Sequence, residues 1–159
     1  MHRLINPNDA DILFTIFMDE KNNPFLSYDQ MSREAFQPLF DELLQQNESF
    51  IFELNHEVVA TYRIKKGSYR TAHVAYIGSL GVHPQHQGKG IGTTLIHSLV
   101  EQLRAEGFKR LELYVDTDNP RGIHFYKKLG FTEEAILKNY FKRSYEESYM
   151  DEIVMVMML

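Results

Sequence analysis

The stretch from Leu80 to Gly92 reads Leu-Gly-Val-His-Pro-Gln-His-Gln-Gly-Lys-Gly-Ile-Gly. It joins an expected strand to an expected helix and places three glycines at alternate positions, at Gly88, Gly90 and Gly92. The first N–H groups of a helix have no partner inside the helix and lie at the positive end of its dipole. Glycines let a phosphate approach these amides, because no Cβ stands in the way. The stretch therefore predicts a pyrophosphate-binding turn, and the alternative is a glycine-rich turn that holds no ligand.

The spacing of these glycines excludes two common nucleotide-binding loops. A Walker loop ends in Gly-Lys followed by Ser or Thr, whereas Gly88-Lys89 is followed by Gly90. A dinucleotide-binding loop reads Gly-x-Gly-x-x-Gly, and here the last interval is one residue shorter. Both nucleotide motifs thus fail on spacing.

The segments on either side of this turn predict a mixed α/β sheet. Upstream, apolar residues recur at helical spacing in two segments, and two β-rich segments flank a turn that begins with Asn55. Downstream, strand and helix patterns alternate, which favours a parallel crossover. The expected helices are 9–18, 32–46, 95–103 and 119–129, and the expected strands are 50–54, 58–64, 72–82, 111–115, a segment from 131 onward and 149–158.

Composition restricts the class of protein. The chain has 159 residues, of which 43% are hydrophobic and 25% charged, and this predicts a single globular domain over residues 1–159. A net charge of −5 argues against a nucleic-acid partner. The absence of cysteine excludes disulfides, thiolate metal sites and a cysteine nucleophile. The N-terminal residues are polar and the longest apolar run, 153–159, is too short to span a bilayer, so we expect a cytoplasmic protein with no membrane partner.

Two segments carry a resemblance to a known family. Gln87-Gly-Lys-Gly-Ile-Gly92 resembles the Gln/Arg-x-x-Gly-x-Gly/Ala signature of the GNAT superfamily of acyl-CoA-dependent N-acetyltransferases. The segment 119–131, Asn-Pro-Arg-Gly-Ile-His-Phe-Tyr-Lys-Lys-Leu-Gly-Phe, resembles the Asn…Tyr-x-x-x-Gly-Phe segment of that family. The late segments 137–140 and 149–151 are similar to its L-amino-acid and phosphinothricin N-acyltransferase branch. The resemblance implies about seven strands and four helices, with a sheet that is partly antiparallel and is parallel in the second half.

The resemblance also implies a binding site for acetyl-CoA. Backbone groups of Leu80, Gly81 and Val82 would pair with the pantetheine arm, and Gly78 and Gly81 would let this strand bulge. Asn119 would reach the pantetheine amides, although capping its helix explains an Asn before a Pro equally well. Lys89 would add a cation beside the diphosphate or would simply be solvated. The residues that would form the diphosphate site are Gln87, Gly88, Lys89, Gly90, Ile91, Gly92 and Thr93.

Acetyl transfer to an amine has three chemical requirements. The ammonium must lose a proton, the oxyanion needs a hydrogen-bond donor, and the leaving thiolate must be protonated. The backbone N–H of Leu80 is the expected oxyanion donor. Tyr126 matches the tyrosine of the family and is the expected catalytic proton donor. The alternative for Tyr126 is a core aromatic at helical spacing between Ile123 and Leu129.

The residue that would accept the amine proton stays open at this point. Many relatives carry a glutamate four residues before the position of Leu80, where this sequence has Tyr76. Asp116 and Glu112 alternate with apolar residues of their strand, so we expect them on its opposite face, exposed to water. A chain of water molecules is a third option. We expect no metal, because no carboxylate close in sequence completes a ligand set with His83 and His86.

The sequence thus predicts an enzyme that transfers an acetyl group from acetyl-CoA to a primary amine by direct attack. The expected acceptor is a small molecule such as an amino acid, a polyamine or an antibiotic-like amine. A non-catalytic acyl-CoA-binding or sensory module is one alternative, and an acetyltransferase for protein N-termini or lysines is another. A homodimer formed through the late strands is compatible with the apolar C-terminal segment.

Overall fold

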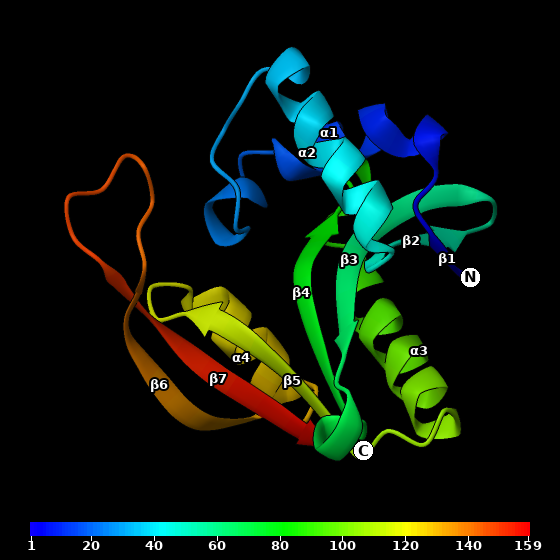
Figure 1. The fold of residues 1–159 in the computed structure, drawn as a ribbon, viewed down its shortest axis with the longest axis vertical. Coiled ribbons are helices and arrows are strands. Elements are labelled where there is room, and N and C mark those ends of the chain that lie inside the picture. Colours follow the sequence, from blue (N-terminus) through cyan, green and yellow to red (C-terminus); the bar gives the residue numbers. More distant parts are fainter. The chain divides into compact units, whose positions relative to one another are not determined.

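The computed structural model describes all residues from 1 to 159 and contains one seven-stranded sheet with the strand order β1-β2-β3-β4-β5-β7-β6 (Figure 1). The chain forms two compact units, residues 1–65 with 78–98 and residues 66–77 with 99–159. The mixed α/β fold is therefore confirmed, whereas the single domain stays a prediction. The elements are β1 (His2–Leu4), α1 (Ala10–Phe17), α2 (Arg33–Gln46), β2 (Ser49–Leu54), β3 (Glu57–Lys66), β4 (Val74–Val82), α3 (Ile91–Ala105), β5 (Arg110–Asp116), α4 (Pro120–Lys128), β6 (Thr132–Phe141) and β7 (Met150–Met158).

Parallel pairing in the second half is limited to one pair of strands. β4 pairs with β5 in parallel, from Val74 opposite Arg110 to Tyr76 opposite Glu112. β7 lies between β5 and β6 and is antiparallel to both. The expected crossover is thus present, but β6 and β7 form an antiparallel ribbon, because a short connection allows antiparallel strands only.

In the first unit, α1 and α2 form an apolar core with β2. Ser32 caps α2 by accepting a hydrogen bond from the Ala35 N–H, and Asn47 ends the helix in the left-handed conformation. Burial of one face of each amphipathic helix stabilises this arrangement. The buried members of the core are Ile5, Ala10, Leu13, Ile16, Phe17, Phe36, Phe40, Leu43 and Ile51.

The irregular residue of β4 is Ser79, which has a φ of 48°. Gly78 and Gly81, which the resemblance implies would let this strand bulge, have no positive φ. Gly81 is needed for another reason, since a Cβ at this position would lie 2.6 Å from Cγ2 of Ile16 in α1. The absence of a side chain at Gly81 therefore allows α1 to approach the backbone of β4.

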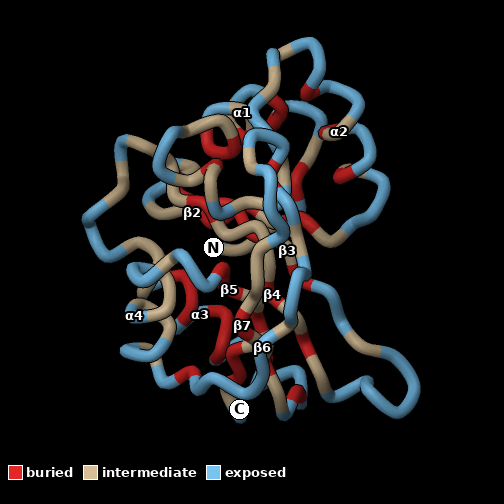
Figure 2. The backbone as a smooth tube through the Cα atoms, turned by 90° about the vertical axis from the view of Figure 1, so that its left-hand side faces the viewer, coloured by how far each residue is buried: buried red, intermediate tan, exposed pale blue.

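In the second unit, alternate residues of β5 are buried as the sequence predicts. Leu111, Leu113 and Val115 are at most 3% exposed and point to one face. α4 lies beside β5 and β7 (Figure 1). Its residues are coloured as intermediate or exposed in Figure 2, and none of them is fully buried. The core of this unit therefore comes mainly from its strands and from residues 99–105 of α3.

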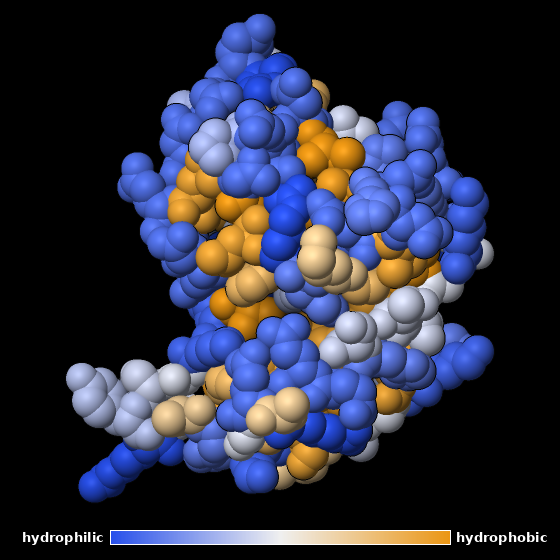
Figure 3. Space-filling view, turned by 90° about the vertical axis from the view of Figure 1, so that its right-hand side faces the viewer, coloured by the Kyte–Doolittle hydropathy of each residue, from blue (hydrophilic) through white to orange (hydrophobic).

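The surface is mostly polar on the face drawn in Figure 3, where hydrophobic residues appear between hydrophilic ones. The exposed large apolar side chains of the second unit include Ile136, Tyr140, Tyr145 and Tyr149 in β6 and the loop that follows it. None of the helices has the length and apolar character needed to cross a bilayer.

We predict that Gly81→Ala lowers the free energy of unfolding by about 1–3 kcal/mol, because the new methyl group overlaps Ile16. Urea denaturation of the purified variant measures this loss. The double variant with Ile16→Ala should lose less stability than the sum of the losses of the two single variants, because the clash is gone. Strict additivity in this double-mutant cycle would contradict the close contact.

Candidate functional site

The glycine-rich turn between β4 and α3 has a backbone that requires glycine. Gly88 and Gly90 have φ values of 73° and 78°, in the left-handed region that side chains disfavour. A Cβ at either position would have no atom within 4 Å. The two glycines are therefore needed for the backbone conformation, and the space beside them is open.

The N–H groups of this turn and of the first residues of α3 are unpaired. No hydrogen bond inside the protein is donated by the backbone N–H groups of residues 88–93, and the first to donate is that of Thr94, to the Gly90 carbonyl at 3.1 Å. Gly88, Lys89 and Gly90 are exposed. Six consecutive peptide donors at the positive end of a helix dipole suit an anion.

Two polar side chains hold this turn in place from within the same unit. The Gln87 amide donates to Oδ1 of Asp19 at 2.7 Å. The Asn22 amide donates to the Val82 carbonyl at 2.8 Å and to the Ile16 carbonyl at 3.0 Å. Gln87, expected beside the coenzyme, thus uses its side chain to anchor the turn. Sequence reasoning missed Asn22, because the Val82 carbonyl that it binds is 60 residues away in the chain.

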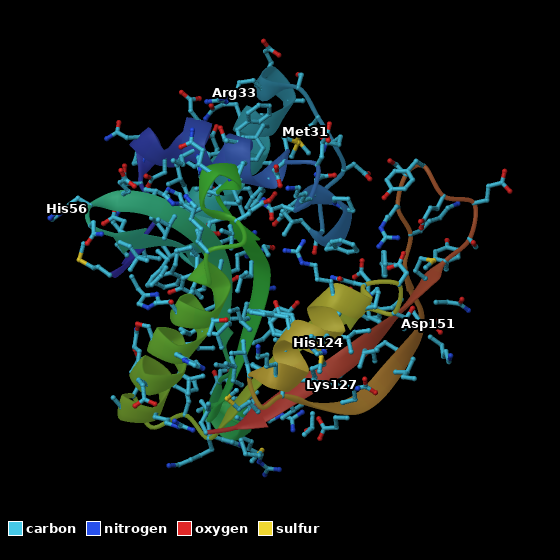
Figure 4. All side chains as sticks on the ribbon, turned by 180° about the vertical axis from the view of Figure 1, so that it is seen from behind. Met31, Arg33, His56, His124, Lys127 and Asp151 are labelled. Atoms are coloured by element: carbon cyan, nitrogen blue, oxygen red, sulfur yellow. The ribbon has the colours of Figure 1, made fainter.

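Asn119 and Tyr126 lie at the start and in the last turn of α4. The Asn119 side chain accepts a hydrogen bond from the Gly122 N–H at 2.8 Å, so the capping role is observed. Tyr126 is half-buried, with its ring 5.0 Å from Phe125 and 5.6 Å from Phe131. By contrast, His124 and Lys127, marked in Figure 4, are exposed.

The Tyr126 hydroxyl makes no hydrogen bond within the protein, although its ring packs against Phe131. Burial raises the pKa of Tyr126 to about 12. The phenol therefore carries its proton at neutral pH and has it available for a partner outside the protein. Tyr126 can thus be both a packed aromatic residue and a proton donor, since its ring contacts Phe125 and Phe131 while its hydroxyl stays unpaired.

The expectation that Asp116 and Glu112 face water is wrong for Asp116. Asp116 is only 9% exposed, and its Oδ2 accepts a hydrogen bond from Nη2 of Arg143 at 2.5 Å. Arg143 comes from the loop between β6 and β7, a contact that strand alternation in β5 does not reveal. Glu112 is half-buried and accepts a hydrogen bond from Arg110 at 2.9 Å. Both carboxylates are thus already paired with arginines.

A third carboxyl group, Glu152 of β7, lies directly across from Asp116. Its Oε2 is buried and has no hydrogen-bond partner. Burial, together with the negative charge of Asp116 beside it, raises the pKa of Glu152 to about 7. Residues 149–158 were expected only to form a strand, and no role was assigned to Glu152. The available signal was a pair of acidic residues, Asp151 and Glu152, at the start of an apolar strand.

The unpaired amides, the capped helix and the tyrosine occur in the part of the chain that matches a family model. The model of the acetyltransferase (GNAT) family matches residues 11–131. This chain belongs to that family. The match covers most of the sequence and includes both of the segments that carried the resemblance.

Individual relatives of this GNAT protein match less of it. An uncharacterized N-acetyltransferase of Methanocaldococcus jannaschii, MJ1207, is 39% identical over 69 residues, which are 43% of this chain and 30% of that protein. A mycothiol acetyltransferase of Beutenbergia cavernae is 43% identical over 61 residues, 38% of this chain and 20% of that protein. The matched segments thus span less than a third of the length of these relatives.

A solved structure confirms the GNAT fold over nearly the whole chain. The spermidine N-acetyltransferase of Vibrio cholerae, in complex with CoA and spermine, aligns with a TM-score of 0.80 at 20% identity and covers 99% of this chain and 94% of that one. At this identity the likeness shows the fold alone.

We predict that Glu152→Gln stabilises the protein at pH 8 and that the gain disappears towards pH 4. A carboxyl group whose pKa is raised from 4.5 to about 7 by folding favours folding in its protonated form, and this contribution is lost as the pH rises through 7. Glutamine resembles the protonated form at every pH. For a half-buried group screened by solvent, we expect a gain of about 1–2 kcal/mol at pH 8.

Urea denaturation of wild type and variant at pH 4, 6 and 8 measures this difference. If the variant were less stable than wild type by the same amount at pH 4 and at pH 8, folding would not raise the pKa of Glu152.

Proposed function

We propose that this protein transfers an acetyl group from acetyl-CoA to a primary amine of a small molecule. The observation that carries the proposal is the run of six unpaired N–H groups from residue 88 to residue 93. The diphosphate of acetyl-CoA is an anion of the kind that such a run binds, and Gly88 and Gly90 leave room for it. Acetyl-CoA thus fits the residues present.

The remaining predicted contacts of the coenzyme are part of this proposal. Backbone groups of Leu80, Gly81 and Val82 pair with the pantetheine arm, and the Leu80 N–H stabilises the oxyanion. Asn119 keeps its cap and offers its amide N–H groups to the pantetheine. Lys89, exposed beside the turn, adds a positive charge near the diphosphate.

Tyr126 donates a proton to the sulfur that leaves the acetyl group. Its pKa of about 12 keeps it protonated until a strong base, the departing thiolate, forms beside it. Neither Asp116 nor Glu112 takes the amine proton in this proposal, because Arg143 and Arg110 bind them.

The test is calorimetric titration with acetyl-CoA, followed by an assay for acetyl transfer to spermidine, to free L-amino acids and to a peptide with a free N-terminal alanine. Acetylation of spermidine or of amino acids supports the proposal. Transfer to the peptide alone would replace it with a protein acetyltransferase. Binding of acetyl-CoA without transfer to any of these amines would leave a non-catalytic acyl-CoA-binding module.

We predict that Gly90→Asp weakens acetyl-CoA binding about 100-fold or more, because a carboxylate then stands beside the diphosphate. The matched control is Gly90→Asn, which has the same shape without the charge and tolerates the left-handed φ of 78°. Calorimetry should show a much smaller loss for Asn than for Asp. Equal affinities of the two variants would contradict an anion at this turn.

We predict that Tyr126→Phe lowers kcat about 100-fold and leaves the midpoint of thermal unfolding unchanged. The stability should hold because the hydroxyl has no partner in the protein while the ring contacts with Phe125 and Phe131 remain. Steady-state kinetics and a thermal scan of the same preparation measure both effects. An unchanged kcat across the pH range would remove Tyr126 from the chemistry.

A further inference from the structure

The second unit holds a pair of acids on one face of its sheet. Asp116 of β5 and Glu152 of β7 are cross-strand partners, so their side chains share a face. Tyr114 lies on that face too, two residues before Asp116 in β5. Tyr76 joins them from β4, with its ring 5.0 Å from the ring of Tyr114.

The two acids of this pair have different partners. Arg143 binds Asp116, and its Nη1 also donates to Asp118 at 2.8 Å and to Glu146 at 3.0 Å. Burial raises the pKa of Asp116, and this arginine opposes the shift by stabilising the ionised carboxylate. Glu152 has no such cation, and its side chain hydrogen-bonds with Asp116. Its buried Oε2 has no hydrogen-bond partner. A buried acceptor without a donor is costly, so this oxygen is satisfied only by a proton or by a donor that arrives with a ligand.

Glu152 and the tyrosine that the proposed function uses, Tyr126, both act on Tyr76. Burial raises the pKa of Tyr76, and the charge of Glu152 and the hydroxyls of Tyr114, Tyr140 and Tyr126 raise it further. Tyr76 thus lies within electrostatic range of both Glu152 and Tyr126. Around Tyr76 the unit thus has both a proton donor without a partner in the protein, Tyr126, and a carboxyl oxygen without one, Oε2 of Glu152.

We propose that Glu152 is the residue that accepts the proton of the acceptor ammonium. This inference rests on the proposed function and adds the base that it lacks. One ammonium proton passes to Oε2 of Glu152, which leaves a neutral amine with a free lone pair. The amine nitrogen then bonds to the thioester carbon as the carbon–sulfur bond breaks. The sulfur takes the proton of Tyr126, a second proton from the nitrogen returns to Tyr126, and Glu152 releases its proton to water.

The surroundings of Glu152 explain why it is suited to this role. A base is most effective when its pKa lies near the working pH and close to that of the group it deprotonates. An ordinary carboxyl group is too weak a base for an amine, and the raised pKa of about 7 brings Glu152 closer. The titratable and charged groups that face this cluster are Asp116, Glu112 and Tyr114 from β5, Tyr76 from β4, Tyr140 from β6, Arg143 from the β6–β7 loop and Tyr126 from α4.

The experiment is a pH profile of kcat/KM from pH 5.5 to 9.5 for wild type and Glu152→Gln, with acetyl-CoA and spermidine or whichever panel amine the wild type acetylates fastest. Wild type should rise with a pKa near 7 and then level off. The variant should be about 100-fold slower at pH 7.5 and should keep rising tenfold per pH unit, because only amine that is already neutral reacts. Glu152→Asp should restore the rise and plateau at a lower rate.

The matched control is Asp151→Asn, which removes one charge from the neighbouring residue at the start of β7 (Figure 4). Asp151 points to the other face of the strand and binds Lys138 and the Asn139 N–H. This variant should keep the wild-type profile. Calorimetry should show unchanged acetyl-CoA binding in Glu152→Gln.

The outcomes separate this inference from the function on which it rests. If wild type acetylates no amine in the panel, the proposed function fails. If wild type is active and Glu152→Gln keeps both its rate and its inflection near pH 7, the function stands and Glu152 is not the base. A loss of rate with the inflection intact would also overturn the inference, because a structural role lowers the rate without removing a titration.

Discussion

The structure depends on a peptide turn whose donors find no acceptor within the protein. Left-handed backbone at Gly88 and Gly90 directs the N–H groups of the turn away from the rest of the chain, and the first intrahelical acceptor is used only at Thr94. Such an arrangement costs stability unless water or an anion satisfies the donors. The contacts made by Gln87 and Asn22 keep the turn in this geometry before a ligand arrives, which reduces the ordering cost of binding.

In the second unit, an ion pair influences which of two neighbouring acids is protonated. Arg143 binds Asp116 at a position where both residues are 9% exposed, and a buried ion pair of this kind persists only with further hydrogen bonds. Asp118 and Glu146 supply these on the other guanidinium nitrogen. Burial raises the pKa of Asp116 and Arg143 opposes that shift, whereas no cation opposes the burial of Glu152. Of the two neighbouring acids, Glu152 therefore holds a proton more readily.

Local patterns in the sequence predicted the features that depend on interactions between residues close in the chain. Asn119 and Pro120 marked the start of α4, and Leu111, Leu113 and Val115 marked the buried face of β5, because capping and alternation involve residues close in sequence. The burial of Asp116 could not be predicted, since its partner Arg143 is 27 residues away in a loop. The reason for Gly81 was likewise out of reach, because it depends on Ile16 of a distant helix.

The same limit applies to the choice of base. The alternation of apolar and polar residues in β5 correctly placed Glu112 and Asp116 on the face opposite its buried side chains. Only the pairing of β5 with β7 shows that Glu152 lies on the same face. Tyr76 occupies the position where the resemblance leads one to expect an acid, and its ring fills that space with a hydroxyl that burial keeps protonated. With arginines bound to the other two acids, the one carboxyl oxygen of this face that is both buried and unpartnered belongs to Glu152. The acid on this face that is best suited to accept a proton is thus the one without an arginine partner, whichever strand carries that acid.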